Sequence, residues 1–513
     1  MIADPPTLAY LLADTDDATV LRGADEPVSA IVYDSRDAEF GALFVALRGA
    51  YSDGHDYLED ARNHGAASCL IDRDLAGLPL DGYAAVARVP DSRRALAAVA
   101  RRYYGDPSRS LKLVGITGTD GKTTTSYIVE HLLQVAGAKT GLIGTIAIRQ
   151  DGRQIRSAGR QTTPESLETQ RLLADMRDAG VEVAIVETSS HGLETHRVDG
   201  CLFDVGVITN ITHEHIDFHG SVEAYRRAKA RLFDMVAASR DEGGLGVAIV
   251  NVDDPGARSV RPSHDDLEVI EYGMDCPGRC RVAASQVRPN EQGYQFDLHL
   301  DRDVHQAELP MTGRWNVSNA LAAVAVCRAL DVDVELILEG MRTLPAVPGR
   351  MQTVQAGQPF GVIVDYAHTA PALEHVLKSV RETTTGSVLL LFGSAGERDI
   401  EKRAEMGAIA ARCADYFVVT SEDPRFEDPD AIIEQIADGA KRAGAIEGVD
   451  FDRQTDRRTA IEQILSRAGE ADTVILAGKG HEQSMIFGAE QRQWDESGVA
   501  IDVLRTLGYM EPE

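Results

Sequence analysis

The chain has 513 residues, of which 43% are hydrophobic and 26% charged, a composition typical of a folded protein with about three domains. Its net charge of −29 argues against a nucleic acid or an anionic membrane surface as a partner. No apolar run reaches the roughly 18 residues of a membrane span, and residues 1–17 carry four Asp but no Lys or Arg, so we expect a cytoplasmic protein without membrane insertion.

Apolar runs separated by Gly- and Pro-containing breaks predict three α/β domains, at 1–108, 109–346 and 347–513. The first contains short predicted strands at 30–32 and 43–47 and ends in the sequence Gly-Asp-Pro-Ser. In the other two, strands alternate with helical segments, the strands lying at 111–117, 181–186, 205–209, 247–251, 362–365, 388–392, 416–420 and 473–477. Such alternation predicts open, mostly parallel sheets.

The most informative stretch is 115–125, which reads Gly-Ile-Thr-Gly-Thr-Asp-Gly-Lys-Thr-Thr-Thr. It follows a predicted strand and precedes a segment, 126–137, with apolar residues at helical spacing. A strand, a glycine-rich turn and a helix form a site where backbone N–H groups hold nucleotide phosphates. Lys122 is predicted to contact the β- and γ-phosphates and the Thr123 hydroxyl to bind Mg²⁺. The loop is a variant, because Ile116 stands where the strict pattern has glycine.

Polar residues follow six of the predicted strands at their carboxyl ends, where open α/β sheets bind ligands. The six clusters are 187–191, 210–219, 365–368, 394–399, 421–425 and 478–482, and together they predict two sheets that face a shared cleft. Lysine is scarce, at 8 of the 52 basic residues. Lys122, Lys229, Lys402 and Lys479 nevertheless fall in motif-like segments.

The six cysteines are spread over the chain, and only Cys276 and Cys280 lie close together. No second pair completes a four-ligand zinc site. We therefore predict free thiols in a reducing compartment.

Further motifs accompany the phosphate loop over nearly the whole chain. They are Glu-Thr-Ser-Ser-His at 187–191, Asn-Ile-Thr-His-Glu-His-Ile-Asp-Phe-His-Gly at 210–220 with Tyr225 and Lys229, and the segments 313–323, 348–350, 365–369, 398–403 and 478–482. In these motifs the chain resembles the Mur ligases, ATP-dependent amide-forming enzymes of bacterial cell-wall synthesis. Within that family it is most similar to ligases that add the third peptide residue to UDP-N-acetylmuramoyl-L-alanyl-D-glutamate. The resemblance implies an N-terminal nucleotide-sugar domain, a central P-loop-type ATPase domain and a C-terminal Rossmann-like domain for the amino acid.

The resemblance also implies the chemistry. ATP converts the substrate carboxylate into an acyl phosphate, which the amine of an amino acid attacks. Lys122 and metal charge offset the anionic groups that meet there. Thr123, Glu187 and His215 are the implied Mg²⁺ ligands. Lys229, on a helix predicted to begin near residue 221, is implied to be carbamylated by CO₂, and the resulting anion would bridge a second Mg²⁺.

Other binding residues are implied by the same matches. For ATP they are Thr117, Gly118, Thr119, Asp120, Gly121, Lys122, Thr123, Thr124, Asn316, Asn319, Arg350 and Asp365. For the UDP substrate they are Ser35, Thr162, Thr163, Ser189, Thr195 and Arg197, and for the amino acid Arg398, Glu422, Asp423, Pro424, Arg425, Gly478 and Glu482. Two positions depart from the family pattern, since Gln161 replaces the usual asparagine and Thr195 stands where glutamine is common. We expect the chain to act as a monomer.

The added amino acid is expected to be selected by Glu422-Asp423-Pro424-Arg425. Family members that add meso-diaminopimelate usually read Asp-Asn-Pro-Arg here, and an arginine suits the distal carboxylate through a bidentate fork. Lysine-adding members typically lack the arginine. Arg425 therefore favours meso-diaminopimelate. Asp423 instead adds a negative charge that would attract the side-chain ammonium of L-lysine or L-ornithine, or would neutralise Arg425, so the sequence leaves these substrates open.

Two further functions remain open from the sequence. One is another ligase of the same fold, acting on folate or on a later muramoyl peptide, in which the Asp-Ser-Arg segment at 34–36 or Arg425 would be out of place. The other is a P-loop protein that binds ATP without turnover. Intact Lys122, Glu187, His215 and Lys229 argue against that second function.

Overall fold

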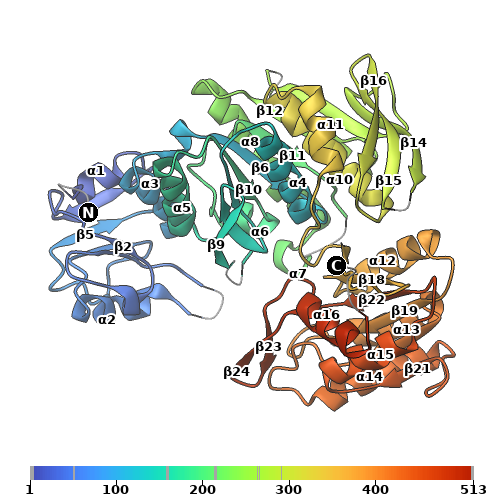
Figure 1. Cartoon of the computed structure of the whole chain (residues 1–513). Coiled ribbons are helices and arrows are strands. Elements are labelled where there is room, and N and C mark those ends of the chain that lie inside the picture. The colour runs from blue at the N-terminus through green and yellow to red at the C-terminus, as the bar shows by residue number, and fades with distance from the viewer. Residues whose placement is uncertain are drawn as a thin grey trace. The chain divides into compact units, whose positions relative to one another are not determined.

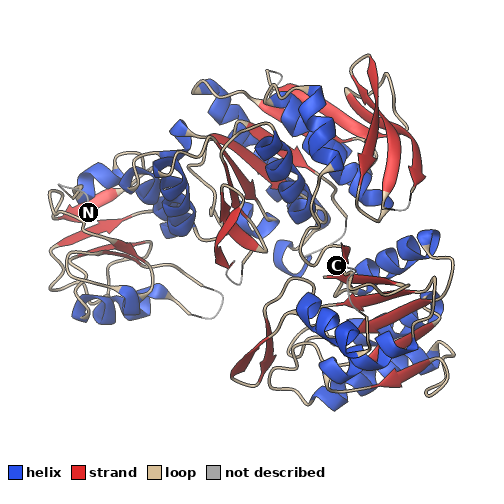
Figure 2. Ribbon diagram, viewed as in Figure 1, coloured by secondary structure: helices blue, strands red, loops and turns tan. Residues whose placement is uncertain are grey.

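The computed structural model describes residues 5–49, 52–157, 161–212, 216–260, 262, 264, 266–290 and 292–509. The chain divides into two compact units, a first unit of 1–283, 299–303 and 321–340 and a second unit of 284–298, 304–320 and 341–513. The architecture comprises three α/β domains with mostly parallel sheets (Figures 1 and 2), as the sequence predicts. The domain limits near 108 and 346 stay predictions. Within the described part of the chain, no helix is long and apolar enough to cross a membrane.

The N-terminal sheet has a separate apolar layer on each face. Its strands are β1 (Thr19–Arg22), β2 (Ile31–Val32), β3 (Leu43–Val45), β4 (Ser68–Ile71) and β5 (Ala85–Arg88), in the order β1-β5-β4-β3-β2. Successive residues of a strand point to opposite faces, so Leu43 and Val45 belong to one layer and Phe44 to the other. The first layer is completed by α1 (Leu8–Leu12) and α3 (Ser92–Tyr103), and the second by α2 (Leu58–Asn63).

The central sheet places β6 between β11 and β10. Its strands in the first unit are β6 (Lys112–Thr117), β7 (Thr140–Ile143), β8 (Ala147–Gln150), β9 (Arg153–Ser157), β10 (Val183–Glu187), β11 (Val205–Ile208), β12 (Val247–Asn251) and β13 (Glu268–Met274), in the order β13-β12-β11-β6-β10-β7-β8-β9. Strands β13 to β7 are parallel, and β8 and β9 form an antiparallel edge. Glu187 pairs with Ile116, and Ile208 with Thr117. Strands β6, β10 and β11 therefore end at the same level, and the loops after them meet.

Helices follow several of these strands, and two of them position the predicted site. The helices are α4 (Lys122–Val135), α5 (Ser166–Asp178), α6 (Ser190–Glu194), α7 (Ile216–His219), α8 (Val222–Asp241) and α9 (Pro255–Ser259), followed in the chain by α10 (Arg314–Ala329) and α11 (Val334–Arg342). Helix α8 begins where predicted, and the Ser221 hydroxyl caps it by accepting the Ala224 N–H at 3.1 Å. Helix α4 begins at Lys122 rather than at residue 126. The reason is Gly121, whose left-handed φ of +82° turns the loop directly into the helix.

The C-terminal sheet carries helices on both faces (Figure 2). Its strands are β17 (Gln352–Thr353), β18 (Gly361–Asp365), β19 (Val388–Phe392), β20 (Tyr416–Val419), β21 (Phe451–Arg453) and β22 (Thr473–Ala477), in the order β17-β18-β22-β19-β20-β21. Helices α12 (Ala370–Thr383), α13 (Glu401–Cys413) and α14 (Pro429–Arg442) share one apolar layer, and α15 (Arg457–Arg467) and α16 (Glu496–Thr506) share the other. Asp365 pairs with Ala477, and Phe392 with Val419. The loops after these parallel strands therefore leave the sheet along one edge.

Among the strands that the sequence did not predict are two groups outside the parallel parts of the sheets. These are β14 (Val282–Pro289), β15 (Tyr294–Leu300) and β16 (Asp303–Leu309), adjacent in the order β16-β15-β14, and the hairpin of β23 (Ser484–Phe487) and β24 (Glu490–Gln493). Strand β15 explains why, since its residues alternate between buried and more exposed positions. A strand with one covered face contains no continuous apolar run, and such runs were the signal for the parallel strands.

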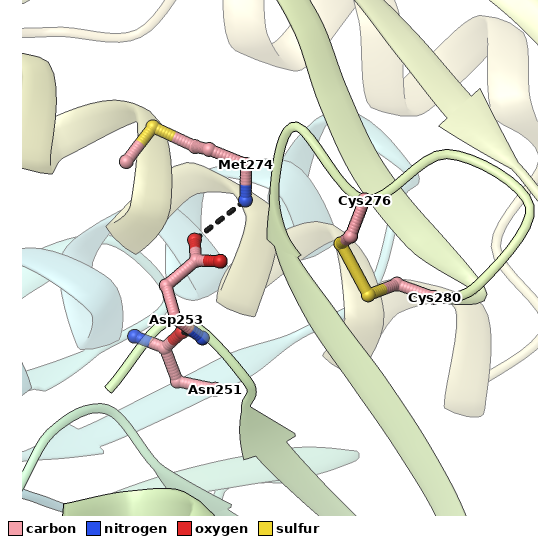
Figure 3. The surroundings of a disulfide bond; sticks show 5 residues. All are labelled: Asn251, Asp253, Met274, Cys276 and Cys280. Carbon is pink, nitrogen blue, oxygen red and sulfur yellow. Dashed lines mark hydrogen bonds between the residues drawn. A yellow bond between two sulfur atoms is a disulfide. The ribbon is translucent and has the colours of Figure 1, made fainter. Parts of the chain in front are cut away.

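The prediction of six free thiols is wrong for one pair of cysteines. Cys276 and Cys280 form a disulfide in the loop after β13 (Figure 3). The Cys280 N–H donates to the Cys276 carbonyl at 3.0 Å, so a tight turn brings the two side chains together. To the left of this turn in the view, the Met274 N–H donates to Asp253 at 2.6 Å (Figure 3). The other four cysteines are free. A spacing of four residues does not by itself reveal this turn.

We expect alkylation of the denatured protein to count the thiols directly. Without reductant the protein should carry four alkyl groups, on Cys69, Cys201, Cys327 and Cys413, and after reduction it should carry six. A Cys276→Ser variant should carry five in both conditions, because Cys280 then has no partner. Intact-protein mass spectrometry distinguishes these counts, and six groups on the unreduced natural chain would contradict the disulfide.

Candidate active site

The phosphate loop is held in shape by the residues that follow β11. The Thr119 N–H donates to the Asn210 carbonyl and the Asp120 N–H to Asn210 Oδ1, both at 2.8 Å. Thr209 Oγ1 donates to the Asp120 carbonyl at 2.6 Å. A Cβ at Gly118 would lie 1.8 Å from that hydroxyl, so only glycine fits there. The predicted loop is therefore one turn fixed by the neighbouring strand end.

Two lysine side chains converge on the carbonyl groups of this loop. Lys122 Nζ donates to the Gly118 and Thr119 carbonyls at 2.9 Å. Lys229 Nζ, on α8, donates to the Gly118 carbonyl at 2.7 Å and lies 4.6 Å from the centre of the Tyr225 ring. Lys229 is 1% exposed. The loop is thus a local positive centre in an acidic protein, which suits it to bind phosphates.

Glu187, the last residue of β10, is wholly buried beside the start of α4. Its Oε2 accepts hydrogen bonds from Thr123 Oγ1 at 2.9 Å and from Thr145 Oγ1 at 2.7 Å. The Thr145 N–H donates to Oε1 at 3.2 Å. A Cβ at Gly144 would lie 2.3 Å from Oε1, so glycine leaves room for the carboxylate. Thr145 and Gly144 were missed because they follow β7, which the sequence did not reveal as a strand.

The structure therefore brings two of the predicted Mg²⁺ ligands, Thr123 and Glu187, into contact. The third, His215, lies outside the described residues. Among the residues that are described, no three His, Cys, Asp or Glu side chains form a cluster able to hold a metal ion. The oxygen atoms of Thr123 and Glu187 are nevertheless the ligand type that Mg²⁺ prefers.

Several of the predicted UDP-substrate residues surround the backbone of Glu187. Thr163 Oγ1 donates to the Glu187 carbonyl at 2.8 Å and accepts the Ser189 N–H at 2.9 Å. Arg197 donates to the Thr163 carbonyl at 3.1 Å. Thr162 Oγ1 accepts from the Thr145 hydroxyl at 3.1 Å. These side chains thus form one polar network with the buried carboxylate.

The remaining UDP-substrate residues lie on nearby turns of the first unit. The Thr195 hydroxyl donates to the His191 carbonyl at 2.7 Å at the end of α6, which is the role of a structural cap. Ser35 is buried in the turn after β2. Its neighbour Asp34 lines a cavity of about 180 Å³ together with Tyr33, Glu168 and others. Gln161 is exposed.

The other four predicted ATP residues belong to the second unit. At the start of α10, Asn319 Nδ2 donates to Asn316 Oδ1 at 2.9 Å, and Asn316 Nδ2 donates to the Thr312 carbonyl at 2.7 Å. Asp365 accepts backbone N–H bonds from residues 351 and 367, both at 2.8 Å. Its burial raises the pKa of this carboxyl group. The Arg350 guanidinium lies 4.9 Å from the centre of the ring of residue 366.

The two loops predicted to bind the amino acid, which follow β20 and β22, are tied together by one buried arginine. Arg457 Nη1 donates to the Ser421 carbonyl at 3.1 Å, and Nη2 donates to the Ala477 carbonyl at 2.8 Å. The guanidinium also pairs with Glu496 of α16 at 2.6 Å, and neither side chain is exposed. Both loops therefore start from carbonyl groups held by the same ion pair. Arg457 and Glu496 were missed because the segments around them carry no recognisable motif.

Inside these loops, charged side chains are packed closely. Asp423 Oδ1 accepts from Lys479 Nζ at 3.0 Å and from the Ile486 N–H at 3.0 Å. Lys479 Nζ also donates to Glu482 Oε2 at 2.5 Å. Burial raises the pKa of the Glu422 and Glu482 carboxyl groups. The site thus gathers three carboxylates around one buried ammonium.

The other predicted amino-acid contacts lie on the same loops. Pro424 is buried and Arg425 is half-buried, with a left-handed φ of +54°. The Arg425 N–H donates to the Ile486 carbonyl at 3.0 Å, which joins the loop to β23. Gly478 also has a positive φ, and a Cβ there would lie 2.9 Å from Glu422 Oε2. Arg398 is exposed.

This arrangement has counterparts among known proteins. Residues 27–104 match the catalytic domain of the Mur ligase family, 116–327 the Mur ligase middle domain, and 349–480 the Mur ligase glutamate ligase domain. Over 491 residues the chain is 44% identical to a UDP-N-acetylmuramyl-tripeptide synthetase of Roseiflexus sp. (strain RS-1), covering 94% of this chain and 95% of that protein. The chain belongs to the Mur ligase family. It is therefore an ATP-dependent acid–amino-acid ligase of peptidoglycan synthesis, as its motifs predict.

Two further similarities extend over the full length of this Mur ligase. It is 39% identical over 501 residues to a UDP-N-acetylmuramoyl-L-alanyl-D-glutamate–2,6-diaminopimelate ligase of Geobacillus kaustophilus (strain HTA426), covering 98% of this chain and 100% of that protein. A solved structure of a ligase with the same name superposes with a TM-score of 0.69 at 27% identity, covering 99% of this chain and 100% of that one. The order and connection of the three domains are therefore those of the family.

The buried ion pair offers a direct test of how the amino-acid loops are held. A Glu496→Gln substitution leaves the Arg457 charge buried without its counter-ion, which destabilises a protein by about 3–5 kcal/mol. We expect a lower unfolding midpoint in calorimetry of the full-length chain, and a larger loss of kcat/KM for the amino acid than for ATP. The matched control, Glu434→Gln, removes a partly exposed carboxylate paired with Arg453 and should shift stability by less than about 1 kcal/mol. Equal effects of the two substitutions would contradict this role.

Proposed function

We propose that this Mur ligase adds meso-diaminopimelate as the third peptide residue of UDP-N-acetylmuramoyl-L-alanyl-D-glutamate. The proposal is supported by the Geobacillus relative, which is named for this reaction. The single structural observation behind it is Arg425, whose buried Nε has no hydrogen-bond partner among the described residues. A buried donor of this kind suits a carboxylate ligand. A distal carboxylate is the group that distinguishes meso-diaminopimelate from L-lysine and L-ornithine.

The proposed reaction has two steps. A carboxylate oxygen of the D-glutamyl residue attacks the γ-phosphorus of ATP, ADP leaves, and an acyl phosphate forms. The amino nitrogen of the added residue, after losing a proton, attacks the acyl carbon, and inorganic phosphate leaves with the electrons of the broken C–O bond. Lys122 and the N–H groups of the phosphate loop offset the negative charge on the phosphoryl group during transfer.

Mg²⁺ fits the contact between Thr123 and Glu187, because both side chains offer oxygen ligands beside the phosphate loop. We assign His215 as a further ligand on its motif alone. The ion would supply positive charge against the phosphate oxygens. Thr145, which donates to both oxygens of Glu187, would keep the carboxylate oriented.

A carbamate on Lys229 fits its surroundings. The carbamate nitrogen keeps one N–H, which can still donate to the Gly118 carbonyl now bonded by the ammonium at 2.7 Å. The new carboxylate would add an anionic ligand for a second Mg²⁺ next to the loop. Formation of the carbamate requires the neutral amine of Lys229, whose side chain is 1% exposed.

The predicted contacts are carried into this proposal. The UDP substrate is assigned to Ser35, Thr162, Thr163, Ser189, Thr195 and Arg197. The adenine region of ATP is assigned to Asn316 and Asn319, Arg350 and Asp365 are assigned to holding the nucleotide, and the amino acid is assigned to Arg398, Glu422, Arg425, Gly478 and Glu482. A monomeric state stays a prediction.

L-Lysine or L-ornithine is the second candidate amine, and it is favoured by the carboxylates of this site, two of which, Asp423 and Glu482, contact Lys479. The test is ATP-dependent phosphate release with UDP-N-acetylmuramoyl-L-alanyl-D-glutamate, comparing meso-diaminopimelate, L-lysine and L-ornithine at equal concentration. We expect kcat/KM for meso-diaminopimelate to exceed the others by at least about tenfold, because a carboxylate-binding arginine left unpaired disfavours substrates without the carboxylate. Preference for a simple diamine would refute the proposal, and no release with any of the three would refute the reaction itself.

The two lysines at the phosphate loop should respond differently to replacement by alanine. Lys122→Ala should lower kcat by more than about 100-fold, because it removes charge that opposes the transferred phosphoryl group. Lys229→Ala should also lose most activity, but formate or acetate should restore part of it by replacing the carbamate. Phosphate release by each variant, measured with and without formate or acetate, gives both the loss of activity and its rescue. Rescue of Lys122→Ala, or no rescue of Lys229→Ala, would contradict the assigned roles.

A further inference from the structure

The second residue of the amino-acid-selecting motif is Asp423, where the family pattern has asparagine. Asp423 is 8% exposed, so its carboxylate is largely removed from water and needs a counter-charge. Its position beside Arg425 in the motif raises the question of which cation serves as that counter-charge. If it were Arg425, the arginine would have little capacity left for a substrate carboxylate.

Lys479 is the counter-charge of Asp423 among the described contacts. Lys479 is wholly buried, and its ammonium lies 3.0 Å from Asp423 Oδ1. The same oxygen accepts the Ile486 N–H at 3.0 Å, so the carboxylate is held by two donors on the neighbouring loop and on β23. Arg425 bonds to the hairpin through its backbone, since its N–H donates to the Ile486 carbonyl and its carbonyl accepts the Gly488 N–H, while among the described residues its side-chain Nε has no partner.

We propose that Lys479 is the residue that allows an aspartate at position 423, because it neutralises Asp423 and thereby leaves Arg425 free to select a carboxylate on the added amino acid. The pair of Asp423 and Lys479 then does what an uncharged asparagine does elsewhere. This inference rests on the proposed function, since it assumes that the two loops bind the side chain of the amino acid.

The groups that remain after this pairing match one kind of ligand. Glu422 is 6% exposed, and its Oε2 has no hydrogen-bond partner among the described residues. Gly478 leaves the space next to that oxygen open, since a Cβ there would lie 2.9 Å away. The motif therefore offers one unpaired carboxylate oxygen and one unpaired guanidinium N–H. An amino acid whose side chain ends in both an ammonium and a carboxylate satisfies both, whereas a simple diamine leaves Arg425 unpaired.

Lys479 also donates to Glu482 at 2.5 Å, so it is held between two carboxylates rather than by Asp423 alone. This second contact has a consequence for substitution. When Asp423 is replaced by asparagine, Lys479 keeps Glu482 as its counter-ion and stays compensated. When Lys479 is removed, Asp423 and Glu482 lose their partner at once, and Arg425 is the cation that the 422–425 motif still carries.

The test is a double-substitution cycle read as amino-acid selectivity, the ratio of kcat/KM for meso-diaminopimelate to that for L-lysine. Lys479→Met should lower this ratio by about tenfold or more, because an uncompensated Asp423 repels the carboxylate and attracts the ammonium. Asp423→Asn alone should raise the ratio, because it removes a negative charge. The variant with both substitutions should return the ratio to within about threefold of the natural enzyme, a rescue that additive effects do not produce.

Controls separate the role of Lys479 from a loss of structure. Lys441→Met removes a partly exposed lysine paired with Glu447 and should leave the ratio unchanged. Lys479→Met alone has the greatest risk of misfolding, so the unfolding midpoint of each variant is measured by calorimetry beside the kinetics. If the single variant is unfolded, the selectivity ratio of the doubly substituted variant, which has no uncompensated Asp423, provides the test. A folded double variant with meso-diaminopimelate preference supports the proposal.

Three outcomes would overturn the inference while leaving the ligase activity intact. They are an unchanged ratio in Lys479→Met, no recovery in the double variant, and an equal loss of kcat/KM for both amines in Asp423→Asn, which would place Asp423 on the substrate ammonium. Inactivity of the unsubstituted enzyme with both amines would instead refute the proposed function. In that case the pair is still tested by stability, because adding Asp423→Asn to the Lys479→Met variant should raise its unfolding midpoint.

Discussion

The ion pair between Arg457 and Glu496 determines where the two amino-acid loops begin. Both side chains are wholly buried, and the arginine also holds the carbonyl groups of Ser421 and Ala477. A buried guanidinium is tolerated only when its charge and its donors are satisfied. Glu496 supplies the charge, and the two carbonyl groups accept remaining N–H groups. The ends of two parallel strands are thereby fixed to two helices on one face of the sheet.

The requirement that a buried charge has a partner also applies to the buried lysines of the predicted site. The chain carries a net charge of −29 and few lysines, yet two of those lysines are buried next to anionic or carbonyl oxygens. Lys229 contacts the phosphate loop, and Lys479 contacts Asp423 and Glu482. Many arginines near the surface are paired with neighbouring acids, as Arg281 is with Glu268 and Asp301, so they carry little information about ligands. Each of these two lysines supplies a positive charge at a loop that the sequence predicts to bind a ligand, within a protein whose overall field is negative.

Most of the parallel strands that carry the site, and the loops after them, could be predicted from sequence, because buried parallel strands are continuous apolar runs followed by polar motifs; β7 was missed. The phosphate loop, Glu187 and the 422–425 motif were found in this way. The residues that hold these side chains and loops in position could not be predicted from sequence. Thr145, Arg457 and Glu496 lie far from any motif in the sequence and meet the site only through the fold. Lys479 was noticed as one of few lysines, but its contact with Asp423 joins two loops separated by a strand order that the sequence does not reveal.

The central claim is that Asp423 is neutralised within the protein and that Arg425 binds the distal carboxylate of the added amino acid. The most direct measurement is a crystal structure of the enzyme with ADP, the UDP substrate and meso-diaminopimelate. We predict that the Arg425 guanidinium contacts the distal carboxylate while Lys479 stays bonded to Asp423, as it is here at 3.0 Å. A structure in which Asp423 leaves Lys479 and binds the substrate ammonium, with Arg425 turned away, would contradict the account.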